Sequence, residues 1–169
     1  MIICIDPGHG GEDNGAAYGY AEEDDFNLII GYLLRFVLQE RGFVVIMTRE
    51  RDVYVPLSQR CSIANANSAD LFVSIHCDAW HDETVEGIST HVYSDETLEV
   101  GGRIQKSLTT IFPGHKDRGV KKSDFYVLRE TSMPAVLVEC EFVSNPETRK
   151  FLREPENQLK IAYAISGGI

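Results

Sequence analysis

The sequence predicts a single α/β domain built around a largely parallel β-sheet. Short apolar runs alternate with segments whose apolar residues recur at helical spacing, which is typical of strand–helix–strand units. The chain has 169 residues, an ordinary length for one domain that buries a sizeable core. It contains no internal repeat, low-complexity run or linker. We therefore expect residues 1–169 to fold as one unit.

The first half of the chain is predicted to hold three strands and two helices. The short apolar run Ile2–Asp6 is the first expected strand, and the helical spacing of Asn27–Arg41 predicts the first helix. Asp24 and Asp25 are placed to cap the start of that helix, and Gly42 is placed to end it. The elements expected next are the strand Phe43–Thr48, the helix Leu57–Asn67 and the strand Leu71–His76.

The second half is predicted to add three strands and more helix. The expected elements are, in order, a strand at Gly87–Tyr93, a helix around Glu99–Phe112, strands at Phe125–Leu128 and Ala135–Cys140, and a tail at Glu147–Gly168 that is helical in two pieces. Pro134 marks the start of the last strand, because proline is common at such boundaries.

Composition and charge argue against several classes of protein. The chain is 43% hydrophobic and 25% charged, as soluble globular proteins are, and no stretch approaches the roughly 20 apolar residues of a membrane helix. A net charge of -10 argues against nucleic acid as the main partner. Met1 runs straight into the first strand with no signal peptide. We therefore expect a cytosolic protein, one exported by a route not encoded here, or a domain of a longer protein.

Two local features carry further expectations. The four cysteines (Cys4, Cys61, Cys77 and Cys140) form no CxxC pair, and three of them lie in strongly apolar runs. They are therefore expected to be buried free thiols. The run KDRGVKK at Lys116–Lys122 carries a surplus of positive charge. We interpret it as a solvated loop, with a rim that contacts anions as the alternative.

Three chemically versatile side chains fall where predicted strands end. His9 lies in the glycine-rich turn PGHGG just past the first strand, His76 ends LFVSIH, and Glu139 lies near the end of PAVLVEC. Because ligands bind beyond the carboxyl ends of parallel strands, these side chains are expected to converge if the strands are neighbours. Burial of Glu139 among apolar residues should raise its pKa, which suits a general acid–base near neutral pH.

Two histidines, a carboxylate and a water molecule make a catalytic zinc site. The third protein ligand is open at this level. Glu12 follows His9 at the H-x-x-E spacing of zinc carboxypeptidases, whereas Glu22 and Glu23 stand just before the first predicted helix. A lone histidine at a strand end is more often structural than a ligand, so position alone leaves both roles open.

Seven segments occur in the order and at the spacing of one known family. They are IDPGHGGEDNGA, EDDFNL, VVIMTRERD, RCSIAN, ADLFVSIH, DRGVKKSDFYVLRETSMPAVLVE and FVSNPE. The sequence thus resembles the zinc-dependent N-acetylmuramoyl-L-alanine amidases, specifically the amidase-3 type catalytic domain of bacterial autolysins and phage endolysins. The resemblance covers nearly the whole chain. It implies an α/β fold with a twisted, mostly parallel sheet and helices on both faces.

The resemblance also implies a zinc ion held by His9, Glu23 and His76. Glu23 is assigned because the family's glutamate stands four residues before the asparagine of its E-x-D-x-N-L motif, here Asn27. By the same correspondence Glu139 is the catalytic carboxylate.

The implied activity is hydrolysis of the amide between the lactyl group of N-acetylmuramic acid and L-alanine of the peptidoglycan stem peptide, by zinc-activated water. The alternative, a zinc carboxypeptidase acting on peptide C-termini, would use Glu12, which the resemblance places at a variable position. A non-catalytic wall-binding domain ranks third. The expected partner is peptidoglycan, with no nucleic acid and no membrane.

The implied place of action is the cell wall, reached by release through lysis or a holin, or as part of a secreted protein. A separate wall-binding module after residue 169 is expected, because so acidic a domain suits an anionic wall poorly. Stem peptides carry carboxylates, so Arg118, Lys121 and Lys122 are hypothesised to steer them.

The sequence departs from the family pattern at two places. Glu141 stands where the family usually has glycine, and its charge would alter the pKa of Glu139 if it pointed into the site. Cys77 and Asp78 replace the common small residue and asparagine after His76. Strand alternation should point Cys77 away from the face that His76 occupies, which argues against a fourth ligand there.

Overall fold

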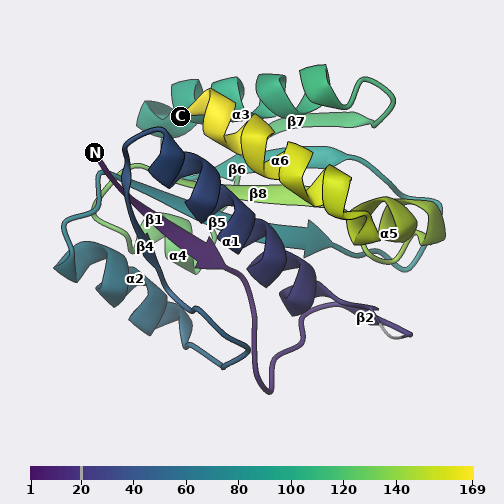
Figure 1. Ribbon diagram of the computed structural model, residues 1–169, viewed down its shortest axis with the longest axis horizontal. Helices are drawn as coiled ribbons and strands as arrows, with labels where there is room; N and C mark the ends of the chain where they lie inside the picture. The colour runs from purple at the N-terminus through teal and green to yellow at the C-terminus, as the bar shows by residue number, and fades with distance from the viewer. Residues whose placement is uncertain (20) are drawn as a thin grey trace.

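A six-stranded sheet lies between two layers of helices in the computed structural model, which describes residues 1–19 and 21–169 (Figure 1). The strands of this sheet are β1 (Ile2–Pro7), β4 (Val44–Met47), β5 (Leu71–Asp78), β6 (Ile88–Val92), β7 (Asp117–Lys122) and β8 (Ala135–Phe142). The helices are α1 (Glu23–Glu40), α2 (Leu57–Ala66), α3 (Leu98–Ile111), α4 (Tyr126–Arg129), α5 (Pro146–Arg153) and α6 (Pro155–Gly168). The short strands β2 (Ala17–Tyr18) and β3 (Ala21–Glu22) form a separate pair, and a 3-10 turn, η1, spans Asp95–Thr97.

The strand order is β4-β1-β5-β8-β6-β7, and the sheet is mostly parallel, as predicted. β4, β1, β5 and β8 all run in one direction, while β6 pairs antiparallel with β8 and β7 runs parallel to β6. The carboxyl ends of β1, β5 and β8 therefore meet at one edge of the sheet. The first residues of β6 and β7 lie at that same edge, because these two strands run the opposite way.

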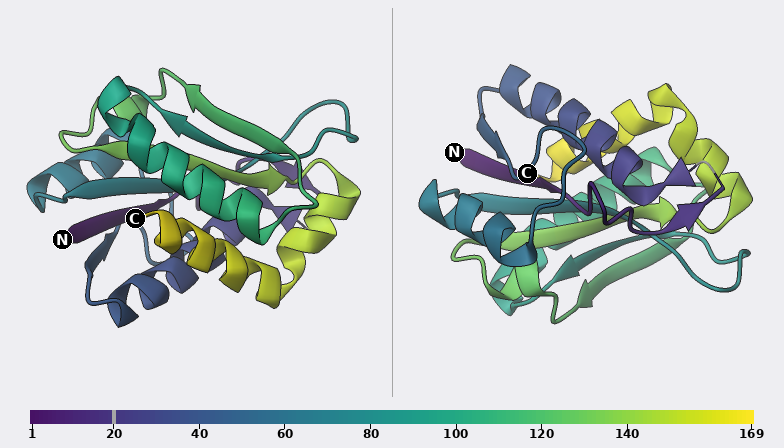
Figure 2. Two further views of the ribbon diagram at one scale, coloured as in Figure 1. Left: turned by 90° about the horizontal axis from the view of Figure 1, so that it is seen from above. Right: turned by 90° about the horizontal axis from the view of Figure 1, so that it is seen from below.

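Helices cover both faces of the sheet, as the α/β prediction required (Figure 2). Alternate residues of β1 divide between two apolar clusters: Ile3 and Ile5 pack in the cluster that contains α1, α3 and α6, while Cys4 packs in the cluster that contains α2 and α4. This period of two is what a strand buried on both faces produces. All four cysteines are free and buried, as predicted, and burial raises the pKa of Cys4 to about 12.

One predicted strand is wrong, and three strands were not predicted: β7 in the main sheet and the short strands β2 and β3. Phe125–Leu128 contributes to the short helix α4, in which the consecutive residues Val127 and Leu128 are both buried against the α2 side of the core. The outermost strand is instead β7, which includes most of the basic run interpreted as a loop. An edge strand is only half-covered, so charged side chains there replace the apolar pattern of an inner strand.

The other elements agree with prediction to within a few residues at their ends. The largest difference is at α1, which begins at Glu23, so Asp24 and Asp25 lie in its first turn and do not cap it. Acidic side chains in a first turn favour the helix through its dipole. The tail is helical in two pieces, separated at Glu154. Across the described part of the chain, no helix has both the length and the apolar character to cross a membrane.

A buried ion pair connects β1 to α2 beneath the site edge. Asp6 Oδ1 accepts hydrogen bonds from Arg60 Nη1 at 2.9 Å and Thr48 Oγ1 at 2.6 Å, and Asp6 Oδ2 accepts one from Ser74 Oγ at 2.8 Å. The side chains of Arg60 and Asp6 are only 3% and 1% exposed. Removing one partner would leave a buried charge without compensation.

We therefore expect Arg60→Met to lower the free energy of unfolding by about 3–5 kcal/mol, measured by chemical denaturation. The matched control is Lys160→Ala, which removes an exposed pair with Glu156 one helical turn away. That variant should unfold at nearly the wild-type denaturant concentration, because exposed pairs contribute little. Equal effects of the two substitutions would contradict this account of the Asp6–Arg60 pair.

Candidate active site

The turn after β1 presents His9 in a left-handed conformation, with φ of 61°. Two arginines that follow in the chain hold this turn. Arg60 Nη2 donates to the carbonyl of His9 at 2.7 Å, and Arg49 Nη2 donates to the carbonyl of Gly8 at 2.9 Å. Both guanidinium groups also donate to the carbonyl of Pro7. The turn is thus fixed by buried donors, which sets the direction of the His9 side chain.

Two glycines between β1 and β2 are required because the side chains of the cluster lie against their backbone. A Cβ atom on Gly8 would lie 2.2 Å from the ring of His76. A Cβ atom on Gly15, which has φ of +64°, would lie 2.5 Å from Glu23 Oε2 and 2.7 Å from the ring of His9. No side chain fits at such distances, so these glycines leave space for the two imidazoles and the carboxylate.

His9, Glu23 and His76 form one cluster. His9 Nε2 lies 3.3 Å from Glu23 Oε2, and His76 Nδ1 lies 3.0 Å from Glu23 Oε1. One ligand atom from each residue falls within 4.8 Å of the others, so the three make a possible metal site. Glu23 is the first residue of α1 and is buried, and its oxygens accept backbone hydrogen bonds from Ala16 and Cys77.

The charges within the cluster depend on one another. Burial opposes ionisation of Glu23, but hydrogen bonds and charges from His76 and His9 hold its pKa well below its usual range. Burial also opposes protonation of His9, yet Glu23 and Asp13 outweigh it and raise the pKa of His9 to about 9. Asp13 Oδ2 lies 2.9 Å from His9 Nδ1, which leaves the Nε2 atom of His9 facing Glu23. The cluster therefore contains an ionised carboxylate between two imidazoles.

Glu139 lies beside this cluster on β8, directly opposite His76 on β5. Its Oε2 atom is buried and has no hydrogen-bond partner among the described residues. Burial, together with the charges of Glu23 and Asp78, raises the pKa of Glu139 well above its usual value, and the ammonium of Lys121 opposes that rise. The prediction that His9, His76 and Glu139 converge at one sheet edge is confirmed.

The other candidates lie elsewhere. Glu12 is exposed and stands outside the cluster, so the geometry does not support the carboxypeptidase alternative. Glu22 precedes α1 in the short strand β3. Cys77 is fully buried and its thiol contacts Cys140, so it does not face the cluster.

Glu141 is fully buried but does not point at Glu139. Its Oε2 accepts the backbone N–H of Gly87 at 2.7 Å, and its Oε1 lies 2.7 Å from Nδ1 of His115. The ring of His115 packs against Phe151 of α5, with 4.2 Å between ring centroids. Where the family usually has glycine, this chain thus has a carboxylate that connects β8 to the segments before β6 and β7.

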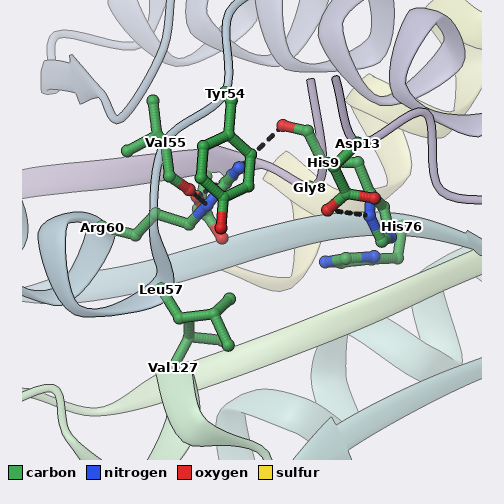
Figure 3. A pocket seen from close by; sticks show the side chains of 10 residues that line it. Gly8, His9, Asp13, Tyr54, Val55, Leu57, Arg60, His76 and Val127 are labelled. Atoms are coloured by element: carbon green, nitrogen blue, oxygen red, sulfur yellow. Dashed lines mark hydrogen bonds and ion pairs between the residues drawn. The ribbon is translucent and has the colours of Figure 1, made fainter. Parts of the chain in front are cut away.

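A pocket opens beside the cluster on the side of β1 (Figure 3). Its volume is about 270 Å³. His9 and His76 lie at one end, and the side chains of Tyr54, Leu57 and Val127 form much of the rest. The pocket is therefore large enough to receive a substrate group next to the two imidazoles.

Sequence reasoning did not assign a role to Arg49, Arg60 or Asp13. The available signal was an arginine directly after a predicted buried strand and another inside a short predicted helix. Arg49 and Arg60 contact carbonyl groups of the glycine-rich turn, and Arg60 also pairs with Asp6. These contacts depend on how distant segments pack.

The fold and this site define a class of protein: an α/β enzyme with a possible His–Glu–His metal site and a buried carboxylate at the carboxyl edge of its sheet. The family model of N-acetylmuramoyl-L-alanine amidases matches residues 3–169. The chain is 33% identical to the germination-specific N-acetylmuramoyl-L-alanine amidase of Bacillus subtilis, over 99% of this chain and 78% of that protein. It is 35% identical to the amidase LytC of the same organism, over 98% of this chain and 34% of LytC.

Among solved structures, the amidase AmiC2 of Nostoc punctiforme superposes with a TM-score of 0.96 at 35% identity, over 100% of this chain and 94% of that one. This chain belongs to the N-acetylmuramoyl-L-alanine amidase family. It is a peptidoglycan hydrolase that cleaves the amide between N-acetylmuramic acid and L-alanine, and the carboxypeptidase alternative is not favoured.

Proposed function

We propose that this domain cleaves the muramoyl–L-alanine amide with a zinc ion held by His9, Glu23 and His76, and with Glu139 as the group that moves the proton. The observation that carries the proposal is the meeting of these four side chains at one sheet edge. Three of them offer ligand atoms within 4.8 Å of one another, and the fourth has a buried oxygen without a partner.

The donor set suits zinc. Two imidazoles and one carboxylate are ligands that catalytic zinc sites use, whereas magnesium and calcium prefer oxygen ligands alone. Asp13 contacts the ring nitrogen of His9 that faces away from Glu23, as outer carboxylates do beside metal-bound histidines. A zinc ion in this position would supply a Lewis acid that polarises the scissile carbonyl and lowers the pKa of a water molecule.

Of the two carboxylates at the site, Glu139 has the raised pKa and a buried oxygen without a hydrogen-bond partner among the described residues, whereas the pKa of Glu23 is lowered. In the proposed reaction its carboxylate takes a proton as water attacks the carbonyl carbon. It then returns that proton to the nitrogen of L-alanine as the carbon–nitrogen bond breaks. One carboxyl group can serve in both directions because burial raises its pKa above that of an exposed carboxyl group.

The proposal is tested by mass spectrometry of the soluble products released from purified peptidoglycan. We expect free stem peptides that begin at L-alanine, no release after treatment with a chelator, and recovery when zinc is restored. Peptides shortened only at their C-termini would contradict the proposed bond. Full release after exhaustive removal of metal would contradict the role of zinc.

We also propose that the domain does not use its own surface charge to bind the cell wall. Its net charge of -10 does not favour binding to an anionic wall. The match to this chain covers only 34% of LytC, so LytC contains further segments outside the matched region. A wall-binding module attached to this domain, or a partner, would serve the same purpose here.

A further inference from the structure

A second cavity opens at the site edge, on the side of β7. Its volume is about 480 Å³. Its lining combines apolar and charged side chains: Trp80, Val85, Phe142, Asp78, Arg118 and Lys121. The pocket that contains Tyr54 lies on the side of β1, so the two cavities extend from the candidate site in different directions along the sheet.

Arg118 lines this cavity, and among the described residues it forms no ion pair with an acidic side chain. Its Nη1 atom donates to the carbonyl of Glu86 at 3.2 Å, and its guanidinium carbon lies 5.0 Å from the ring centroid of Phe142. Its Nε atom is buried and has no hydrogen-bond partner among the described residues. A guanidinium held by one carbonyl and one ring has donors left for a planar carboxylate.

Lys121 supplies a second cation. Its Nζ atom lies 3.4 Å from the hydroxyl of Ser89, and no carboxylate in the described part of the chain lies within 4.0 Å of it. Its neighbour Lys122 behaves differently, because the Nζ atom of Lys122 forms an ion pair with Asp95. The basic run is thus divided: Arg118 and Lys121 line the cavity, and Lys122 does not.

The cavity lies next to the proposed reacting groups, and Lys121 and Ser89 connect it to Glu139. Ser89, which Lys121 contacts, lies directly opposite Glu139 in the pairing of β6 with β8. Lys121 and Asp78 both line the cavity and both act on the charge of Glu139. A substrate whose scissile bond lies at Glu139 would therefore place one of its two halves in this cavity.

The two halves of the substrate differ in charge. The half that holds the carbonyl is an acetylated sugar, which carries no charge. The half that leaves as an amine is a peptide, which carries carboxylates. In stem peptides the residue after L-alanine is a D-glutamate linked through its γ-carboxyl, and its α-carboxyl is either free or amidated. Two cations against the single acid Asp78 give this cavity a net positive lining, which matches the peptide half.

We propose that Arg118 and Lys121 form a carboxylate-binding subsite for the stem peptide, and that this subsite selects a free α-carboxylate over a carboxamide on the residue after L-alanine. The proposal rests on the proposed function, because it takes the cleaved bond to lie at Glu139. Arg118 determines specificity most directly, because it lines the cavity and is not among the groups that shift the pKa of Glu139.

The test uses the zinc-loaded protein and two synthetic N-acetylmuramoyl dipeptides that differ only in D-glutamate or D-isoglutamine after L-alanine. We expect kcat/KM for the carboxylate substrate to exceed that for the carboxamide by about tenfold, as a charge-assisted hydrogen bond provides. Arg118→Gln should reduce the preference to less than about threefold, mainly by raising KM for the carboxylate substrate. The matched control Lys122→Gln should keep the wild-type preference.

The free product dipeptides give a second measurement, as inhibitors of peptidoglycan hydrolysis. L-alanyl-γ-D-glutamate should inhibit wild type more strongly than its amidated counterpart, and Arg118→Gln should remove the difference. Equal kinetics and equal inhibition for both forms, or a preference that survives Arg118→Gln, would overturn the subsite and leave the amidase function intact. A melting temperature close to that of wild type shows that the Arg118→Gln variant is folded. Failure of wild type to cleave peptidoglycan at all would instead overturn the proposed function.

Discussion

Glu139→Gln is expected to lower kcat for peptidoglycan hydrolysis by about 10²–10⁴-fold, the usual contribution of a positioned acid–base group. Glutamine has nearly the same shape but cannot take a proton from water or return one to the amine of L-alanine. The wild-type Oε2 atom has no hydrogen-bond partner to lose, so the fold should persist. Release of L-alanine-terminated peptides measures the rate, and the zinc content and melting temperature show that the site is otherwise intact.

The matched control for this substitution is Glu141→Gln, two residues along the same strand. Glu141 is fully buried, whereas Glu139 is half-buried, and the Glu141 carboxylate holds Gly87 and His115 and faces away from Glu139. This variant should therefore unfold more easily, yet keep kcat within a few-fold of wild type below its unfolding temperature. If Glu139→Gln kept wild-type kcat, or if both variants lost activity equally while folded, the assignment of Glu139 would be wrong.

Glu23→Gln is expected to abolish stable zinc binding, and with it nearly all activity. Glu23 contributes the only carboxylate of the three-residue cluster, and both histidines lie against its two oxygens. An amide oxygen is a weaker zinc ligand than a carboxylate, so zinc affinity should fall by at least about 100-fold. Metal analysis after gel filtration should find about one zinc per wild-type chain and less than about a tenth in the variant.

Glu12→Gln is the control for that result. Glu12 is exposed and lies outside the cluster, so this variant should keep both zinc and activity. Stoichiometric zinc in Glu23→Gln, or loss of zinc in Glu12→Gln, would show that the ligand set is different from the one proposed.

The inner strands could be predicted from the sequence because burial on both faces leaves a continuous apolar run. Ile2–Asp6 and Leu71–His76 were found in this way, and their ends indicated where His9 and His76 would meet. The expected convergence of His9 and His76 with Glu139 depended on the assumption that the strands are parallel neighbours. Parallel neighbours are what the sheet contains, with His76 directly opposite Glu139.

The elements that sequence reasoning missed are those whose pattern depends on partial exposure. β7 is an edge strand with four basic residues in or beside it, so its composition is that of a loop. Phe125–Leu128 has the composition of a strand, but it needs to bury only Val127 and Leu128, and one helical turn does so. The roles of Arg49 and Arg60 depend on carbonyls that become neighbours only after folding.

Because β6 and β7 run opposite to the other strands, the residues proposed for bond cleavage and those proposed for substrate selectivity lie on different elements of the sheet edge. The groups proposed for bond cleavage lie on or beside the ends of β1, β5 and β8, which are buried and closely paired. The second cavity is bounded instead by the connection from β5 to β6, which projects beyond the sheet in Figure 2, and by the start of β7. Substitutions, insertions or deletions in that connection can change which peptidoglycan the enzyme accepts while the cleavage machinery stays in place. Natural variation and directed evolution of substrate range should therefore concentrate at residues 79–87 and 116–121.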